Sequence, residues 1–217
     1  MREKLLYFIA ILIAYPCLCI GQTVASMSKP VDVEHWISSH FAQGVVPPFS
    51  FEYGGKPSEE FIKNWVYSAK SLNSDDRNKV RYCYTYQDPV SGLKVDCDVK
   101  GFTDSQAIEW VLHFTNTGTD NTSEIANVCV SDILFRYERP GKFNLHYAKG
   151  SSASKADFAP QLKVLFSGEN FYMRPYGGRS SDSSFPFFNI ESPCNQGVMV
   201  AIGWTGTWFS DIRCTDG

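Results

Sequence analysis

The residue types best suited to hold a ligand are concentrated between Tyr176 and Trp208. Gly177 and Gly178 permit a tight turn, and hydrogen-bond donors and acceptors follow directly. The apolar run at 198–202 predicts a buried strand that delivers two tryptophans to one end of a sheet. Because pyranose faces stack on indole while sugar hydroxyls pair with polar side chains, the stretch predicts a sugar-binding surface. The candidate substrate-binding residues are Arg179, Ser181, Asp182, Trp204 and Trp208.

A structural role for the same stretch stays open. Aromatic side chains fill protein cores before they line sites, and glycine pairs serve hairpins as well as ligand loops. Trp204, Trp208 and the 179–182 segment therefore also suit a sandwich core or a domain interface.

Sequence signatures of catalysis are missing from the chain. It has no Gly-x-Ser-x-Gly elbow, no phosphate-binding glycine loop and no His-Glu-x-x-His motif. Retaining glycoside hydrolysis needs two carboxylates about 5–5.5 Å apart. One pair to consider is Asp182 with Glu191. The other is Asp96 with Asp98, which fall on the solvent side of a predicted hairpin, where a charged strand face explains them. We therefore predict no catalytic residues.

No metal or cofactor is predicted either. His35 and His40 are five residues apart, and this spacing suits joint ligation neither on a strand nor on a helix. No two cysteines have the spacing of a zinc site, so we expect no structural metal.

The length and net charge of the chain limit which classes of protein it can belong to. A chain of 217 residues with 15% aromatic residues is long enough for one good core. Its net charge is -3 and its pI is about 5.8, so it lacks the basic surface that attracts nucleic acids or anionic membranes. We expect a single domain over residues 22–217 and no nucleic-acid partner.

Residues 1–21 have the pattern of an export signal. A short positive start is followed by an apolar stretch up to Ile20 that is short for a membrane span. Cleavage after Gly21 would leave a periplasmic or secreted chain with no membrane attachment. The alternative, a lipid anchor on Cys17 or Cys19, lacks the small residue that should precede the modified cysteine.

The cysteines beyond the signal are Cys83, Cys97, Cys129, Cys194 and Cys214. An odd number in an exported protein leaves at least one thiol unpaired. Cys83 and Cys97 stand symmetrically about a turn at 88–92, so a disulfide across this hairpin is one expectation. The alternative is that all five are small buried apolar side chains.

Strand patterns dominate the chain. Segments 81–86 and 93–99 flank the 88–92 turn and predict the clearest hairpin, with Val95, Cys97 and Val99 facing the core. The alternation repeats at 108–114. Further strands are predicted at 125–137, 143–148, 162–166 and 198–202.

Helical signals are few. Residues 58–70 have apolar residues at helical spacing, which predicts a short amphipathic helix, and a helical turn is predicted around Trp36. Short strands separated by turn residues, with no internal repeat, predict an all-β fold: an antiparallel β-sandwich with one short helix.

Four segments in order resemble one protein family. They are Pro47–Gly55 (PPFSFEYGG), Ala107–Gly118 (AIEWVLHFTNTG), Tyr176–Pro193 (YGGRSSDSSFPFFNIESP) and Gly197–Ile212 (GVMVAIGWTGTWFSDI). They are similar to the N-terminal β-sandwich of exported bacterial α-galactosidase-like glycoside hydrolases, and the similarity covers nearly all of the chain after the signal.

This resemblance implies a supersandwich of the galactose-mutarotase type, and galactoside-type substrates in carbohydrate metabolism. In that family a (β/α)₈ barrel follows the sandwich and holds both catalytic aspartates, the nucleophile in a Lys-x-Asp motif. Lys94-Val95-Asp96 matches this motif by letters only, because it lies within the sandwich. The chain stops at Gly217, before the barrel and before the last sandwich strands, which implies a non-catalytic N-terminal domain or fragment.

The partners that the resemblance implies are a galactoside-type carbohydrate and the barrel domain of the same enzyme family. The alternative function is a free-standing carbohydrate-binding or partner-docking β-sandwich. If strands are missing after Cys214, an unpaired sheet edge invites association, so we expect a marginally stable or self-associating protein.

Overall fold

The computed structural model describes residues 13–14, 31–135, 141–193 and 196–215. Its strands form four antiparallel sheets, which confirms the all-β, sandwich-like class. The described residues fall into two compact units. Unit 1 spans residues 32–134, and unit 2 holds Ile13–Ala14, Val31 and the described residues beyond Leu134. Each unit is described by itself.

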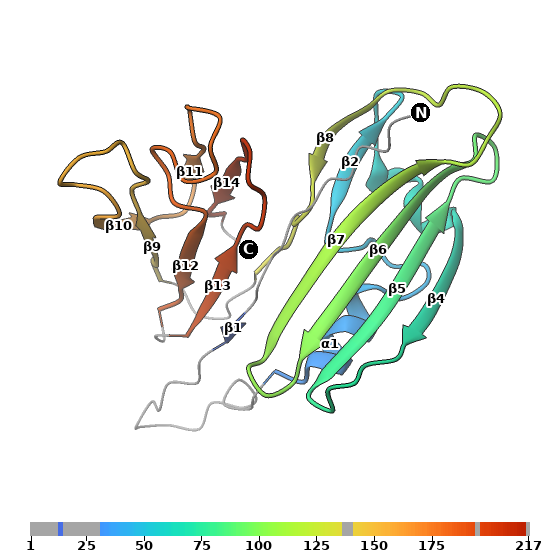
Figure 1. Ribbon diagram of the computed structural model, residues 1–217, viewed down its shortest axis with the longest axis horizontal. Helices are drawn as coiled ribbons and strands as arrows, with labels where there is room; N and C mark the ends of the chain where they lie inside the picture. Colours follow the sequence, from blue (N-terminus) through green and yellow to red (C-terminus); the bar gives the residue numbers. More distant parts are fainter. Residues whose placement is uncertain (1–12, 15–30, 136–140, 194–195, 216–217) are drawn as a thin grey trace. The chain divides into compact units, whose positions relative to one another are not determined.

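Unit 1 is built on a four-stranded sheet in the order β4-β5-β6-β7 (Figure 1). Its strands are β4 (Val66–Leu72), β5 (Lys79–Gln87), β6 (Leu93–Phe102) and β7 (Ala107–Asn116). Buried and half-buried residues alternate strictly along β6. One face of the sheet therefore lines the core, which confirms the predicted hairpin and its inward residues Val95, Cys97 and Val99.

Asp88 sets the turn between β5 and β6. Its backbone N–H donates to the carbonyl of Leu93 at 2.8 Å, and its carboxylate accepts from the N–H groups of Val90 at 3.1 Å and Ser91 at 3.3 Å. Gly92 completes the turn at φ +76°, a conformation that glycine favours. Burial raises the pKa of Asp88, but hydrogen bonds from the Ser91 hydroxyl and the two amides outweigh it and hold the pKa below its usual value.

A second, three-stranded sheet in the order β3-β2-β8 packs on this sheet through aromatic rings. Its strands are β2 (Ser50–Tyr53), β3 (Lys56–Pro57) and β8 (Ile125–Cys129). Phe49 meets Tyr86 with 5.8 Å between ring centroids, and Phe51 meets Phe114 at 5.2 Å. Both contacts are edge-to-face, a favourable aromatic geometry. An aromatic core therefore joins the sheets of unit 1.

Helix α1 (Val33–His40) packs against β6 of the same unit. It starts after Asp32, whose carboxylate accepts a hydrogen bond from a first-turn N–H. Val33 and Ile37 are buried beside Gly101, where a Cβ atom would lie 2.5 Å from Val33 Cγ1 and 2.9 Å from Ile37 Cδ1. The absence of a side chain at Gly101 therefore lets the helix approach the sheet.

The prediction of a helix at 58–70 is wrong. Ser58–Glu60 and Ile62–Asn64 form short 3₁₀ turns, and Val66–Leu72 is strand β4. Trp65 stacks on Phe61 at 5.1 Å, so the apolar residues of this segment serve a ring cluster rather than a helix face. Pairing of β4 with β5 along its whole length outweighs the local helical pattern. The helix forms instead where the sequence predicted a helical turn, around Trp36.

Unit 2 has a five-stranded sheet in the order β1-β13-β12-β9-β10 and a two-stranded ribbon of β11 and β14. Its strands are β1 (Ile13–Ala14), β9 (Phe143–Ala148), β10 (Pro160–Leu165), β11 (Asn170–Met173), β12 (Phe187–Glu191), β13 (Gly197–Ala201) and β14 (Ser210–Arg213). Tyr147 of β9 contacts Phe171 of β11 at 5.0 Å, so the ribbon packs on the sheet.

Several predicted strands differ in detail. Strands occur near 143–148, 162–166 and 198–202 as expected, although the last of these is half-buried rather than buried. The strand predicted at 125–137 ends at Cys129, and its last two residues lie outside the described part of the chain.

Most of the predicted export signal lies outside the described residues. Ile13 and Ala14, within it, form β1 (Ile13–Ala14), which pairs antiparallel with Met199 and Val198. Among the helices that the structure describes, none has the length and apolar character needed to cross a membrane.

We expect Gly101→Ala to destabilise unit 1. The added methyl group would lie 2.5–2.9 Å from carbons of Val33, Val80 and Ile37, and overpacking of this kind costs about 1–3 kcal/mol. Urea unfolding measures the loss. Val33→Ala is the matched control: because it removes a clashing methyl group, the double variant should lose less stability than the two single variants summed. Equal stability of Gly101→Ala and wild type would contradict this packing.

Candidate functional site

The structure brings the residues of the predicted sugar site together within unit 2. The N–H of Ser180 donates to the carbonyl of Thr205 at 3.2 Å. The indole Nε1–H of Trp208 donates to the carbonyl of Ser180 at 2.6 Å. The 179–182 segment therefore lies against the 204–208 segment.

The tryptophans of this cluster are largely occupied by their own chain. Trp208 is 2% exposed and its indole N–H is already bonded, so its ring has no open face for a sugar. Trp204 is half-buried, and a Cβ atom on Gly206 would lie 2.7 Å from its Nε1. The Trp204 ring therefore folds over the backbone of its own turn.

The polar residues of the cluster also stabilise the loop. Arg179 Nη2 lies 3.8 Å from Asp182 Oδ1, and an ion pair of this length with an exposed arginine contributes little. The Asp182 carboxylate fills the space that a side chain on Gly177 would need. The backbone carbonyl of Ser181 accepts from the N–H of Ser151 at 2.7 Å. These contacts hold the 179–182 loop in its folded conformation. A role of this loop in sugar binding stays a prediction.

A second group of ligand-type side chains lies on the exposed face of the β11–β14 ribbon. The register places Asn170 opposite Arg213 and Tyr172 opposite Asp211, so alternate residues of both strands share one face. Arg174 and Phe209 extend the two strands by one residue. We call this surface the ribbon face; its members are Asn170, Tyr172, Arg174, Phe209, Asp211 and Arg213, all of them exposed.

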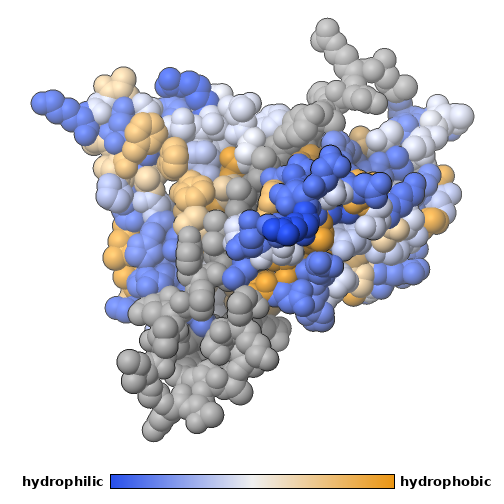
Figure 2. Space-filling model, turned by 60° about the horizontal axis from the view of Figure 1, so that its bottom comes forward, coloured by the Kyte–Doolittle hydropathy of each residue, from blue (hydrophilic) through white to orange (hydrophobic). Residues whose placement is uncertain are grey.

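Two stacked rings form the centre of the ribbon face. Tyr172 and Phe209 are each 50% exposed, and their rings lie 6.0 Å apart at an interplanar angle of 23°. Beside them, the guanidinium carbon of Arg174 lies 4.8 Å from the centroid of the Tyr176 ring. Tyr176 is itself 74% exposed. Figure 2 shows hydrophobic residues, in orange, among hydrophilic ones, in blue, on the face that it draws.

Paired charges border these rings. Arg213 donates to one carboxylate oxygen of Asp211 through Nε at 2.8 Å and Nη2 at 2.6 Å, a charge-assisted contact. The opposite side of the ribbon anchors it, because Met173 is buried and Phe171 and Ile212 are half-buried. The backbone of the ribbon face is therefore held by the buried side of the ribbon.

Sequence reasoning missed the ribbon face although its signal was present. Residues 170–174 alternate polar or exposed aromatic residues with apolar ones, as a two-faced strand does. Phe209 directly follows Trp208. The prediction chose Trp208, which is buried, and passed over Phe209, which is exposed.

The outer face of the unit 1 sheet carries Asp96 and Asp98 among polar partners. Asp96 accepts from Thr85 Oγ1 at 2.6 Å and pairs with Lys94 Nζ at 2.7 Å. Asp98 Oδ2 lies 3.3 Å from His113 Nε2. Both carboxylates therefore belong to a charge-paired strand face, as the sequence predicts, rather than to a catalytic pair.

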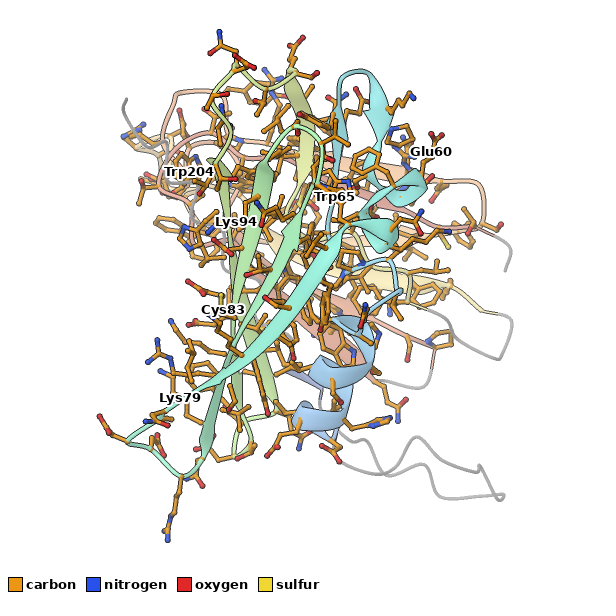
Figure 3. All side chains as sticks on the ribbon, turned by 90° about the vertical axis from the view of Figure 1, so that its right-hand side faces the viewer. Glu60, Trp65, Lys79, Cys83, Lys94 and Trp204 are labelled. Atoms are coloured by element: carbon orange, nitrogen blue, oxygen red, sulfur yellow. The ribbon has the colours of Figure 1, made fainter. Side chains whose placement is uncertain are left out.

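The Cys83–Cys97 disulfide does not form in the structure, where both residues are free thiols. The register pairs Cys83 with Asp98 and Cys97 with Tyr84. Since neighbouring residues on a strand point to opposite faces, Cys83 lies on the outer face and Cys97 in the core. Figure 3 shows Cys83 partway along the sheet, between Lys79 and Lys94. The expectation assumed a register one residue away, and that shift moves a side chain to the other face.

Neither thiol is prepared for nucleophilic attack. Burial, followed by the hydrogen bond to Asp98, raises the pKa of Cys83 to about 11. Burial raises the pKa of Cys97 well above its usual value. A thiol that stays protonated at neutral pH is a poor nucleophile.

Glu191, a member of the second carboxylate pair considered above, is engaged within unit 2. It lies on β12, 2.6 Å from His146 Nε2 and 3.1 Å from Asn144 Nδ2. The hydrogen bond from His146, followed by that from Asn144, lowers the pKa of Glu191. A general acid in glycoside hydrolysis needs a raised pKa, so Glu191 does not suit that role.

A hollow of about 350 Å³ lies on unit 1 between the 87–92 turn and the 117–121 loop. Its walls are tied by the N–H of Thr117, which donates to the carbonyl of Gly92 at 3.0 Å. The carboxylate of Asp88 is already used within the turn. In the part of the chain that the structure describes, no group of three His, Cys, Asp or Glu side chains could hold a metal ion.

Comparison with known proteins matches the chain to no family model and to no curated protein. The candidate site therefore depends on the geometry of the chain itself.

Cys83 should be alkylated slowly by iodoacetamide at pH 8 and faster as the pH approaches about 11. Asp98→Asn removes the carboxylate that raises the Cys83 pKa, so it should lower this pKa and speed alkylation at pH 8 several-fold. Peptide mass mapping measures the rates. Asp96→Asn is the control, because that carboxylate contributes less to the shift. A linked Cys83–Cys97 peptide would contradict the observed register.

Trp208→Phe should destabilise unit 2 more than Trp204→Phe does. The first change removes the indole donor from the part-buried carbonyl of Ser180 and trims a side chain that is 2% exposed, and loss of such a hydrogen bond costs about 1 kcal/mol. Thermal unfolding followed by near-UV circular dichroism compares the two variants. A larger loss of thermal stability in Trp204→Phe than in Trp208→Phe would contradict the structural role of Trp208.

Proposed function

We propose that this chain is a non-catalytic carbohydrate-binding β domain and that the ribbon face holds a galactoside-type sugar. The observation that carries the proposal is the stacked, half-exposed pair of Tyr172 and Phe209. The apolar face of a pyranose matches an aromatic surface of this kind. Arg174 and the Asp211–Arg213 pair stand beside the rings, where planar polar groups can meet the sugar hydroxyls.

The resemblance to α-galactosidase-like enzymes supports the choice of sugar. Segment Tyr176–Pro193, which carries part of that resemblance, begins two residues after Arg174 and three after the end of β11. We propose accordingly that the chain serves as the N-terminal sandwich of such a glycoside hydrolase. The export pattern of residues 1–21 supports a periplasmic or secreted place of action.

Binding suits this geometry better than catalysis does. Among the described residues, the carboxylates considered for an acid and nucleophile pair already hold other partners: Asp96 holds Thr85 and Lys94, and Glu191 holds His146. Neither is on the ribbon face. A flat, open surface buries only part of a sugar, so we expect a Kd on the order of 1 mM, which is about -4 kcal/mol.

The test is calorimetric titration of the purified chain with methyl α-galactoside. Tyr172→Ala and Phe209→Ala should each weaken binding about tenfold or more, because each removes one ring of the stacking surface, worth about 1.4 kcal/mol by this ratio. Phe158→Ala is the matched control. Its ring is 52% exposed in the same unit but contacts Phe185 rather than the ribbon. It should leave the affinity unchanged.

Three results would each contradict a part of the proposal. The first is the absence of binding heat at sugar concentrations about tenfold above the expected Kd. The second is binding that survives Tyr172→Ala but is lost in Trp204→Ala, which would move the sugar to the loop cluster at 179–182. Release of nitrophenol from p-nitrophenyl α-galactoside by the chain alone would overturn its non-catalytic assignment.

A further inference from the structure

Strand β4 leaves one edge of the unit 1 sheet open. It pairs with β5 along all seven residues, from Val66 opposite Gln87 to Leu72 opposite Arg81, and among the described residues no strand pairs with its other side. Six of its seven residues are exposed. The opposite edge strand, β7, has four buried, five half-buried and one exposed residue, so β4 is the more exposed of the two edge strands. Figure 1 shows β4 at the border of the sheet.

The devices that normally protect an edge strand are largely missing from β4. Proteins block such edges with proline, bulges, short strands or several charges. β4 contains no proline, its register with β5 is continuous, and Lys70 is its only charged residue.

The strand is also held ready for pairing. Tyr67 faces the sandwich side of the sheet, where its ring lies 5.5 Å from Tyr86 and its hydroxyl donates to the carbonyl of Phe41 at 2.7 Å. An edge that is ordered in advance loses little conformational freedom when a partner strand docks.

The side chains of β4 are self-complementary about Ala69. In an antiparallel pair of two copies centred there, Val66 of each copy lies opposite Leu72 of the other, and Ser68 lies opposite Lys70. Val66 is 58% exposed and Leu72 is 37% exposed, and both lie on the outer face of the sheet. Such a pair therefore contains two Val66–Leu72 contacts, one at each end of the interface.

Neighbouring registers are poorer. Centring the pair on Lys70 places two lysines opposite each other, and like charges directly opposite are unfavourable. Centring it on Ser68 places Val66 opposite Lys70 and leaves Leu72 opposite Asn64, outside the strand. The pattern of apolar residues and charge thus selects the register at Ala69.

We propose that two copies of the chain associate through their β4 edges, in antiparallel register centred on Ala69, to form a two-fold dimer with one continuous eight-stranded sheet. A two-fold pair uses the same edge on both copies and closes on itself, so association stops at the dimer. This interface involves β4 alone and is independent of the ribbon face and of sugar binding.

Sedimentation velocity of the purified chain under reducing conditions tests the proposal. Wild type should pass from monomer to dimer as its concentration rises. Val66→Lys/Leu72→Lys places like charges opposite each other at both ends of the interface and should weaken the dimer by about tenfold or more. Val66→Lys/Leu72→Glu places the introduced lysine of each copy opposite the introduced glutamate of the other and should restore the dimer.

Val90→Lys is the matched control, because Val90 is 92% exposed at the tip of the β5–β6 turn, outside β4, and this variant should dimerise as wild type does. Near-UV circular dichroism shows that each variant keeps its fold. The proposal is overturned by a wild type that stays monomeric, by association that continues beyond the dimer, or by equal dimer strength in the Lys/Lys and Lys/Glu variants.

Discussion

The hydrogen bonds of Asp88 within the β5–β6 turn are the constraint on which most of unit 1 depends. Because Asp88 pairs with Leu93 across the turn, every residue of β5 meets a fixed partner on β6. That register turns the tyrosines and most apolar residues of both strands toward the core and leaves the charged residues on the outer face. A shift of one residue would exchange the two faces. The packing of α1, the aromatic contacts with β2 and the open edge at β4 all depend on this assignment of faces.

The same turn explains what the sequence could and could not predict. Strict alternation along 93–99 was enough to predict the hairpin and its inward side, because one face is buried and the pattern is strong. The cross-strand partners were not predictable in this way, because they depend on which two residues close the turn. Hence Val95 was placed correctly, whereas Cys83 was paired with Cys97 rather than with Asp98. At 58–70, the helical spacing of apolar residues predicted a helix that does not form. Ring stacking around Trp65 and pairing with β5 decide the structure there, and both are tertiary effects.

Unit 2 shows a similar limit at the candidate site. The sequence marked the 179–182 loop and the 204–208 segment, and the structure places them in contact. It could not show that Trp208 would donate its N–H to that loop and be buried, since this depends on the path of the loop. The exposed rings of Tyr172 and Phe209 come from strands far apart in the chain, and only their pairing in the ribbon joins them into one surface. Trp208, which the sequence marked, is thus buried in the fold, whereas strand pairing brings together the two rings of the proposed binding surface.

The central claim is that a galactoside binds on the ribbon face, and chemical-shift mapping tests it most directly. Amide and aromatic-ring resonances of the labelled chain are followed by NMR as methyl α-galactoside is added. The largest changes should fall on Tyr172, Phe209 and the neighbouring amides of β11 and β14, and they should saturate together. Changes confined to the 179–182 loop and the Trp204 ring, or no saturable changes at all, would contradict the claim.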